Sequence, residues 1–152
     1  MAGNAPQRNI PQLPHLKAIV ISAAWHPEIC DALIAGAVRG FRAAGIGNPA
    51  TRTVAGSFEL PLAAQLAFDE GFDVAVIVGL VLRGETPHFD YVCQGVTQGV
   101  MDVSLSRSKP IGFGVLMCDS LEQATARAGL PGSTEDKGYD SALAALSVIT
   151  KG

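Results

Sequence analysis

The longest apolar stretch of the chain covers residues 74–82 (VAVIVGLVL) and holds no polar residue. Its length and its content of β-branched residues favour a strand. Apolar and polar residues do not alternate along it, so both of its faces need cover, as in a parallel sheet between two helical layers. We expect this strand at Asp73–Leu82 and three others at Lys17–Ala23, Ala50–Ala55 and Ile111–Met117.

Between the expected strands, apolar residues recur at a spacing of three and four, which predicts helices. Pro27 and Pro61 each stand where the first turn of a helix tolerates proline. The helix that begins at Pro27 is closed by Gly45 and Gly47, and the helix from Pro61 stops at Gly71.

Three further helices are expected from the residues at their starts. A possible N-cap residue precedes proline or an acidic residue in each case. The pairs are Thr86 with Pro87, Asp119 with Glu122, and Ser133 with Asp136. We expect the first of these helices to run to about Leu105, the second to end near Gly129, and the third to close the chain.

Strands and helices therefore alternate along the chain, with two helices at the end. This order predicts a single-domain three-layer αβα sandwich around a four-stranded parallel sheet. We assign residues 17–152 to this domain and residues 1–16 to an extended arm, because Pro6, Pro11 and Pro14 preclude a helix there. Ligands of such folds bind outside the carboxyl ends of the strands, which directs attention to four loops.

Composition excludes several classes of protein. The 152 residues carry a net charge of −3 without a basic run, which argues against a nucleic-acid partner. No stretch reaches the roughly 20 apolar residues of a membrane span, and the first residues lack the layout of a signal peptide. Cys30, Cys93 and Cys118 are far apart and odd in number, which suits reduced thiols in the cytoplasm.

The loop after the long apolar strand carries the most suggestive chemistry. Gly84 allows the backbone to approach a ligand, and the first turn of the following helix offers free N–H groups that suit phosphate. His88 lies in this turn, and an imidazole is the kind of side chain that a proton shuttle needs. The alternative is an ordinary N-cap followed by a surface histidine.

The loops after the first two strands are less specific. Glu59, assisted by Ser57, could hold sugar-like hydroxyls, but a carboxylate near a helix start also simply complements the helix dipole. Trp25 could stack on a planar ring or equally cover the edge of the sheet.

The other candidate residues have simpler interpretations. From local sequence alone, Arg127 and Lys137 are solvated charges and Phe113 belongs to the core of its strand. A metal site of His88 and Cys93 is not favoured, because a spacing of five does not place them on one helix face and no further ligands accompany them. No nucleotide-binding or nucleophile-elbow motif stands in the right structural context.

Taken together, these blocks resemble 6,7-dimethyl-8-ribityllumazine synthase from riboflavin biosynthesis. The resemblance begins near Lys17 and reaches the end of the chain. It is carried by residues 24–26 (AWH), 56–61 (GSFELP), 83–90 (RGETPHFD), 110–116 (PIGFGVL), 122–129 (EQATARAG) and 136–138 (DKG). It implies a flavodoxin-like fold and a cofactor-free transferase. The enzyme would condense 5-amino-6-(D-ribitylamino)uracil with 3,4-dihydroxy-2-butanone 4-phosphate to give the lumazine, phosphate and water.

The resemblance also implies roles for individual residues. Trp25 would stack on the pyrimidine, and Phe113 of an adjacent subunit would close over it. His88 would move protons, and Arg127 of the neighbour would bind the phosphate. The remaining contacts to the ring, the ribityl chain and the phosphate would come from Ser57, Phe58, Glu59, Val81, Leu82, Gly84, Glu85, Thr86 and Lys137.

Members of this family are built on pentamers, and we expect a homopentamer here. Two features depart from the family pattern: Met117 and Cys118 stand where small hydroxyl residues are common, and the loop at 129–137 is longer than in the icosahedral shells. Two other functions remain open from sequence, a non-catalytic paralogue that keeps only a binding or scaffold surface and a flavodoxin-like redox protein.

Overall fold

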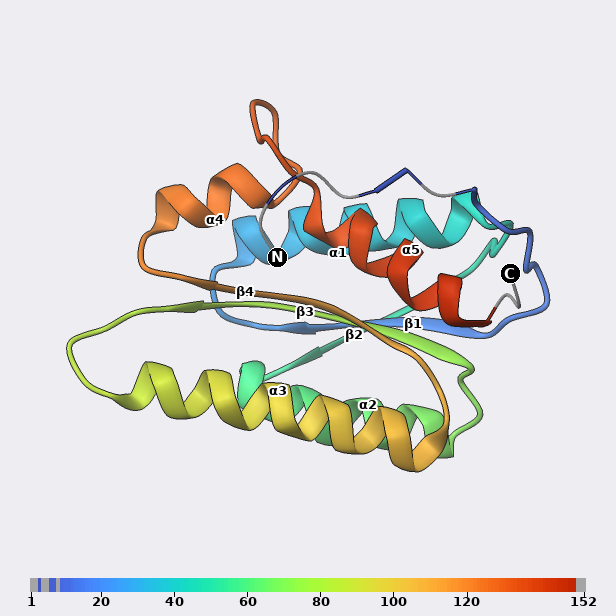
Figure 1. Ribbon diagram of the computed structural model, residues 1–152, viewed down its shortest axis with the longest axis horizontal. Helices are drawn as coiled ribbons and strands as arrows, with labels where there is room; N and C mark the ends of the chain where they lie inside the picture. Colours follow the sequence, from blue (N-terminus) through green and yellow to red (C-terminus); the bar gives the residue numbers. More distant parts are fainter. Residues whose placement is uncertain (1–2, 4–5, 8, 150–152) are drawn as a thin grey trace.

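The computed structural model of the protein describes residues 3, 6–7 and 9–149. Within this part of the chain a sheet lies between two layers of helices, with α1, α4 and α5 on one face and α2 and α3 on the other (Figure 1). The strands are β1 (Ala18–Ala23), β2 (Ala50–Val54), β3 (Val74–Leu82) and β4 (Ile111–Cys118). The helices are α1 (Pro27–Ala43), α2 (Leu60–Asp69), α3 (His88–Arg107), α4 (Leu121–Arg127) and α5 (Lys137–Ile149), with a 3₁₀ turn at Ser57–Glu59 before α2.

All strand pairs are parallel, in the order β2-β1-β3-β4, so the expected three-layer fold with a four-stranded parallel sheet is confirmed. The pairing of β3 differs on its two sides. β1 pairs with β3 only as far as Val78, whereas β4 follows β3 to Leu82. The last four residues of β3 therefore have no strand partner on the β1 side.

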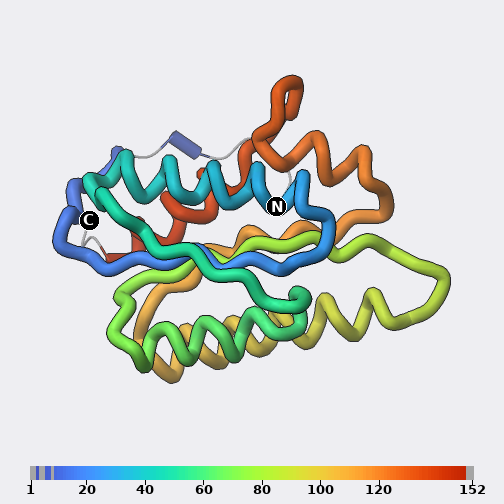
Figure 2. The backbone as a smooth tube through the Cα atoms, turned by 180° about the vertical axis from the view of Figure 1, so that it is seen from behind, coloured from blue at the N-terminus to red at the C-terminus, as the bar shows by residue number. Residues whose placement is uncertain are grey.

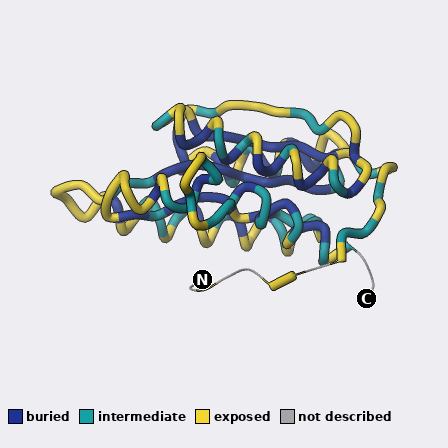
Figure 3. The backbone as a smooth tube through the Cα atoms, turned by 90° about the horizontal axis from the view of Figure 1, so that it is seen from above, coloured by how far each residue is buried: buried dark blue, intermediate teal, exposed yellow. Residues whose placement is uncertain are grey.

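β3 is buried on both faces, as its unbroken apolar sequence predicts. Val76 and Val78 pack into the core beneath α1 and α5, while Ala75 and Ile77 pack into the core above α2 and α3. The sheet forms the buried centre of the molecule, and the loop after β3 projects from it as an exposed tip (Figure 3).

Helices α1 and α5 approach each other closely at a glycine. A Cβ added to Gly138 would lie 2.1 Å from the carbonyl oxygen of Leu33. Gly138 therefore lets the first turn of α5 rest on the backbone of α1. This contact fixes the direction of α5 and the position of Lys137, the residue that precedes the glycine.

Two of the predicted helix caps are wrong by small shifts. Ser120, not Asp119, caps α4 by accepting a hydrogen bond from the amide of Gln123. Asp136, not Ser133, caps α5 by accepting from the amide of Tyr139 at 3.3 Å, and it also pairs with Arg39 of α1 at 2.8 Å.

The part of the N-terminal arm that the structure describes between residues 9 and 16 contains no helix or strand. The amide of Leu13 donates to the carbonyl of Ala44, and Ile10 and Leu16 pack against the core under α1. Arm residues 1–2, 4–5 and 8 lie outside the described residues. Among the described helices, none is long and apolar enough to cross a lipid bilayer.

The contact of Gly138 leads to a prediction of stability. Replacing Gly138 with alanine should lower the free energy of unfolding by about 3 kcal/mol, because the added methyl group meets backbone that cannot rotate away. Urea denaturation followed by circular dichroism measures this loss. Gly47→Ala is the matched control, since nothing lies within 4 Å of a Cβ at that glycine. Equal midpoints for the two variants would contradict the role of the close contact.

Candidate active site

The carboxyl ends of all four strands lie at one end of the molecule, where the loop after β3 extends furthest (Figure 2). The strand order determines which loops are neighbours. The turn after β2 and the turn after β1 lie on one side of the β3 loop, and the turn after β4 lies on the other. Most residues expected at the site lie on these loops.

The turns after β1 and β2 bring Trp25 and Glu59 together. A Cβ built on Gly56 would lie 3.2 Å from Glu59 Oε2 and 3.4 Å from Trp25 Nε1, so both side chains lie over this glycine. Trp25 is 67% exposed, so it does not cover the edge of the sheet as one interpretation had it. An exposed indole beside a carboxylate offers a stacking surface and a hydrogen-bond acceptor to the same ligand.

Ser57 and Phe58 support this turn in different ways. Ser57 is buried, and its hydroxyl lies against Gly79 of β3, where a Cβ would come within 2.6 Å of the oxygen. The ring of Phe58 lies over Gly95 of α3 in the same manner, although much of the ring remains exposed. The 3₁₀ turn is thus held between β3 and α3.

Cys30 fixes the backbone of Trp25 by a hydrogen bond. Its thiol donates a hydrogen bond to the carbonyl of Trp25 at 3.0 Å. Burial raises the pKa of the Cys30 thiol, which keeps the proton that this bond requires. His26, the next residue after Trp25, has a left-handed backbone with φ of 54°. Both features fix the turn that presents the indole.

The expected phosphate loop, residues 84–88, is exposed throughout. Helix α3 begins at His88, one residue later than predicted. The Thr86 hydroxyl still accepts a hydrogen bond from the amide of His88, at 3.4 Å, but Pro87 occupies the cap position. Gly84 has nothing within 4 Å of a Cβ, so a ligand has open access to its backbone.

Arg83 connects this loop to the rest of the edge. Its guanidinium pairs with Asp119 at 2.8 Å and with Asp90 at 3.4 Å, and it lies 4.3 Å from the centre of the Phe89 ring. Its amide donates to the carbonyl of Cys118. One arginine thereby joins the start of the β3 loop, the first turn of α3 and the turn that leads to α4.

Val81 and Leu82 are the half-buried last residues of β3, and they pair with β4 on one side only. β1 pairs with β3 only as far as Val78, so no strand lies beside the end of β3 on the β1 side. This open side of β3 lies close to the turns that carry Trp25 and Glu59, so the edge of a heterocycle can approach the strand backbone there.

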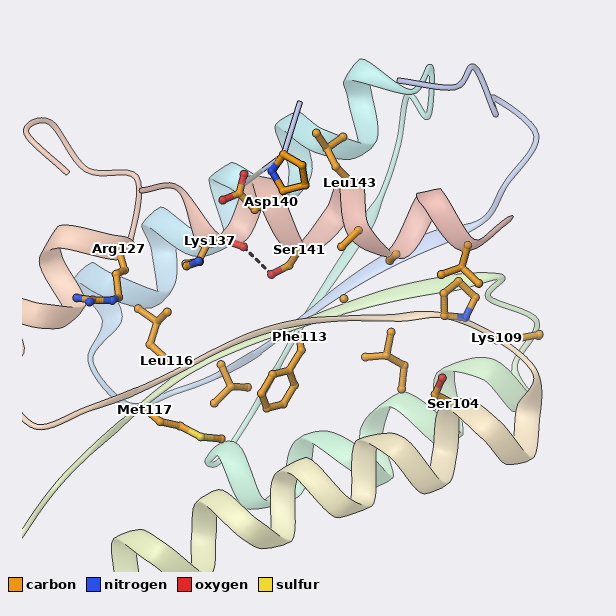
Figure 4. Close-up of a pocket in the computed structure, with 18 of the residues that line it drawn as sticks. Ser104, Lys109, Phe113, Leu116, Met117, Arg127, Lys137, Asp140, Ser141 and Leu143 are labelled. Atoms are coloured by element: carbon orange, nitrogen blue, oxygen red, sulfur yellow. Dashed lines mark hydrogen bonds between the residues drawn. The ribbon is translucent and has the colours of Figure 1, made fainter. Parts of the chain in front are cut away.

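The remaining expected residues line a different surface. An open groove of about 1030 Å³ follows β4, the edge strand, and Phe113, Arg127 and Lys137 are among its lining residues (Figure 4). Phe113 is 41% exposed, so its assignment to the core is wrong. Neither Trp25 nor any residue of the 84–88 loop lines this groove. One chain therefore holds the expected site residues on two separate surfaces.

Charged side chains lie close together at one end of the groove. Glu135 pairs with both Arg127 and Lys137, and Arg127 also donates to the carbonyl of Gln123. Burial raises the pKa of the nearby Asp140 carboxyl, an effect that Lys137 partly opposes. Glu135 thus balances part of the positive charge of Arg127 and Lys137, and Lys137 also interacts with the Asp140 carboxylate.

The sequence interpretation assigned no role to two of these charged residues, Arg83 at the β3 loop and Glu135 in the groove. No local sequence pattern indicates a role for either residue. The pairing of Arg83 with Asp119 spans 36 positions, and Glu135 lies in an irregular loop. No group of three or more His, Cys, Asp or Glu side chains able to hold a metal ion occurs in the described part of the chain.

This arrangement is that of an α/β enzyme with a small-molecule site at the carboxyl edge of a parallel sheet. Residues 15–151 match the sequence model of the family described as 6,7-dimethyl-8-ribityllumazine synthase. The protein of that name from Streptomyces coelicolor is 48% identical to this chain, and the one from Paenarthrobacter aurescens is 50% identical. The first alignment covers 94% of this chain and 89% of that protein, and the second covers 91% and 86%. The chain therefore belongs to the 6,7-dimethyl-8-ribityllumazine synthase family of transferases, as the resemblance predicted.

The contacts of Arg83 yield a prediction about the loop. Arg83→Lys should accelerate amide hydrogen exchange several-fold at Asp90 and Tyr91, whose amides donate to the carbonyl that ends this loop. An ammonium lacks the planar fork with which Arg83 pairs with Asp119 and Asp90 while it lies over Phe89. Exchange read by mass spectrometry measures the effect. Arg107→Lys, which alters an ion pair with Asp69 in the last turn of α3, should leave the loop unchanged. Equal exchange in both variants would show that the contacts of Arg83 do not hold the β3 loop in place.

Proposed function

We propose that this chain forms 6,7-dimethyl-8-ribityllumazine from 5-amino-6-(D-ribitylamino)uracil and 3,4-dihydroxy-2-butanone 4-phosphate, in active sites built between two copies. The observation that carries the shared site is the separation of the expected residues. Trp25, Glu59 and the 84–88 loop lie at the carboxyl edge, while Phe113 and Arg127 line the groove of β4. A second copy that brings its β4 groove against this carboxyl edge would unite them.

The carboxyl edge supplies the half that binds the pyrimidine. Trp25 offers its exposed indole face to the ring, and the backbone of Val81 and Leu82 offers hydrogen bonds to the ring edge. Ser57, Phe58 through its backbone, and Glu59 fix the ring and the ribityl chain. Phe113 of the neighbouring copy covers the opposite face, which explains why a large aromatic residue stands exposed on an edge strand.

The second substrate meets the β3 loop. Gly84, Glu85 and Thr86 offer accessible backbone and hydroxyl groups to its phosphate, and Arg127 of the neighbour adds a planar guanidinium fork. Lys137 stands beside the pyrimidine in the same groove. Holding both substrates in reacting positions replaces an encounter in solution by a step within one complex.

His88 is the proton carrier of this mechanism. The 5-amino group attacks the ketone, and a first water leaves to form an imine. Phosphate is then eliminated, and the ribitylamino nitrogen closes the ring on the remaining carbonyl with loss of a second water. Each step moves a proton to or from the substrates, and an exposed imidazole in the first turn of α3 can donate and accept near neutral pH.

The interface also defines the symmetry of the assembly. Two different surfaces of one chain meet, which is a head-to-tail contact and closes into a ring when the rotation permits. We propose a homopentamer in the cytoplasm, the ring size that the family resemblance implies. The partners of the chain are then copies of itself and its small-molecule substrates.

His88 and Arg127 should differ in kinetic effect. His88→Ala should lower kcat roughly 100-fold with a smaller change in KM, because proton transfer is lost. Arg127→Ala should raise KM for the butanone phosphate on the order of 10- to 100-fold, because a charged hydrogen bond to phosphate is lost. Lumazine absorbance measures both, with His15→Ala in the arm as control. A wild-type rate no faster than the spontaneous reaction would instead support a non-catalytic scaffold.

Mixed assemblies test whether the site is shared. When His88→Ala and Arg127→Ala chains are coexpressed in equal amounts, about a quarter of the sites should combine two intact halves in a head-to-tail ring. Activity should then rise well above that of either parent. If both residues served one site of the same chain, every site would carry a substitution and activity would equal the mean of the two parents. Light scattering on the same samples gives the number of subunits.

A further inference from the structure

Glu135 links the two cations of the β4 groove. Its carboxylate lies 3.1 Å from Lys137 Nζ through one oxygen and 3.6 Å from Arg127 Nε through the other. Its side chain is only 20% exposed, less than that of either cation. A partly buried carboxylate between two cations is less screened by solvent than an ordinary surface ion pair.

The backbone holds Glu135 in this position. Its amide donates to the carbonyl of Ala126, and its own carbonyl accepts from the amide of Gly129, both at 3.0 Å. These bonds attach Glu135 to the end of α4, the helix that carries Arg127. Because the bonds use only backbone atoms, the side chain can be exchanged without removing them.

Two groups of the same chain already contact the guanidinium of Arg127. Its Nη1 donates to the carbonyl of Gln123 at 2.8 Å, and its Nε faces Glu135. A phosphate that approaches this guanidinium therefore competes with a carboxylate that is already present. The same carboxylate also reduces the attraction of Lys137 for an anion.

We propose that Glu135 is an internal competitor of phosphate, a carboxylate that pairs with Arg127 and Lys137 and weakens the binding of phosphate to Arg127. This rests on the proposed role of Arg127 in binding the phosphate of the substrate. The consequence concerns the product side of the reaction. When inorganic phosphate leaves, the Glu135 carboxylate pairs again with the cations. Phosphate is therefore bound less tightly and is released faster.

Binding of inorganic phosphate to the assembled protein tests this role. Glu135→Gln keeps the backbone contacts but removes the negative charge, so it should tighten phosphate binding about 3- to 10-fold in isothermal titration calorimetry. KM for the butanone phosphate should fall by a similar factor. Glu122→Gln, which removes one exposed carboxylate from the start of α4, should change neither. Size-exclusion chromatography verifies that all variants have the same assembly state.

Two outcomes would overturn the proposal. Unchanged phosphate affinity in Glu135→Gln would mean that the carboxylate does not compete, and weaker affinity would mean that it orients the cations instead. Arg127→Ala separates this result from the proposed function. If Arg127→Ala weakens phosphate binding while Glu135→Gln fails to tighten it, the phosphate role of Arg127 stands and the competitor is excluded. If Arg127→Ala has no effect on phosphate, the role of Arg127 itself is wrong.

Discussion

The burial of β3 on both faces is the constraint on which the rest of the structure depends. A strand without a polar face must lie between two helical layers, and the connections that achieve this leave all four strands parallel. Parallel strands collect their carboxyl ends at one edge. Polar groups that have no place in either core are therefore gathered at that edge, and the loop that carries Gly84 and His88 begins directly where the buried strand ends.

A second consequence follows from unequal strand lengths. β3 extends four residues beyond its pairing with β1, because β1 turns upward into α1 after Ala23. This mismatch leaves one side of the end of β3 without a neighbouring strand, close to the turns that carry an exposed tryptophan and a carboxylate. The site thus arises from the geometry of the sheet as much as from the side chains around it.

The sequence predicted the elements and their order well because β3 is an unbroken apolar run and the helices have clear periodic patterns. Pro27 marks the start of α1 as expected. It predicted helix starts less well, since Asp119 and Ser120 are both good caps and only the local backbone decides which one accepts the bond. Phe113 was misplaced because an apolar strand at the edge of a sheet has the same composition as a central one. The pairing of Arg83 with Asp119 depends on tertiary contact alone, so no local pattern could announce it.

In the proposed shared site, the exposed aromatic residues connect assembly with catalysis. Trp25, Phe58 and Phe113 remain largely uncovered in one chain, which is unfavourable for a free monomer and favourable where copies meet. An enzyme whose halves lie on different surfaces cannot act before it assembles, so its cations face solvent in the unassembled chain. Two neighbouring cations without a counter-ion would attract any anion and repel each other. A carboxylate fixed between them by backbone bonds removes that repulsion, which makes a groove with two cations compatible with a stable chain before its partner arrives.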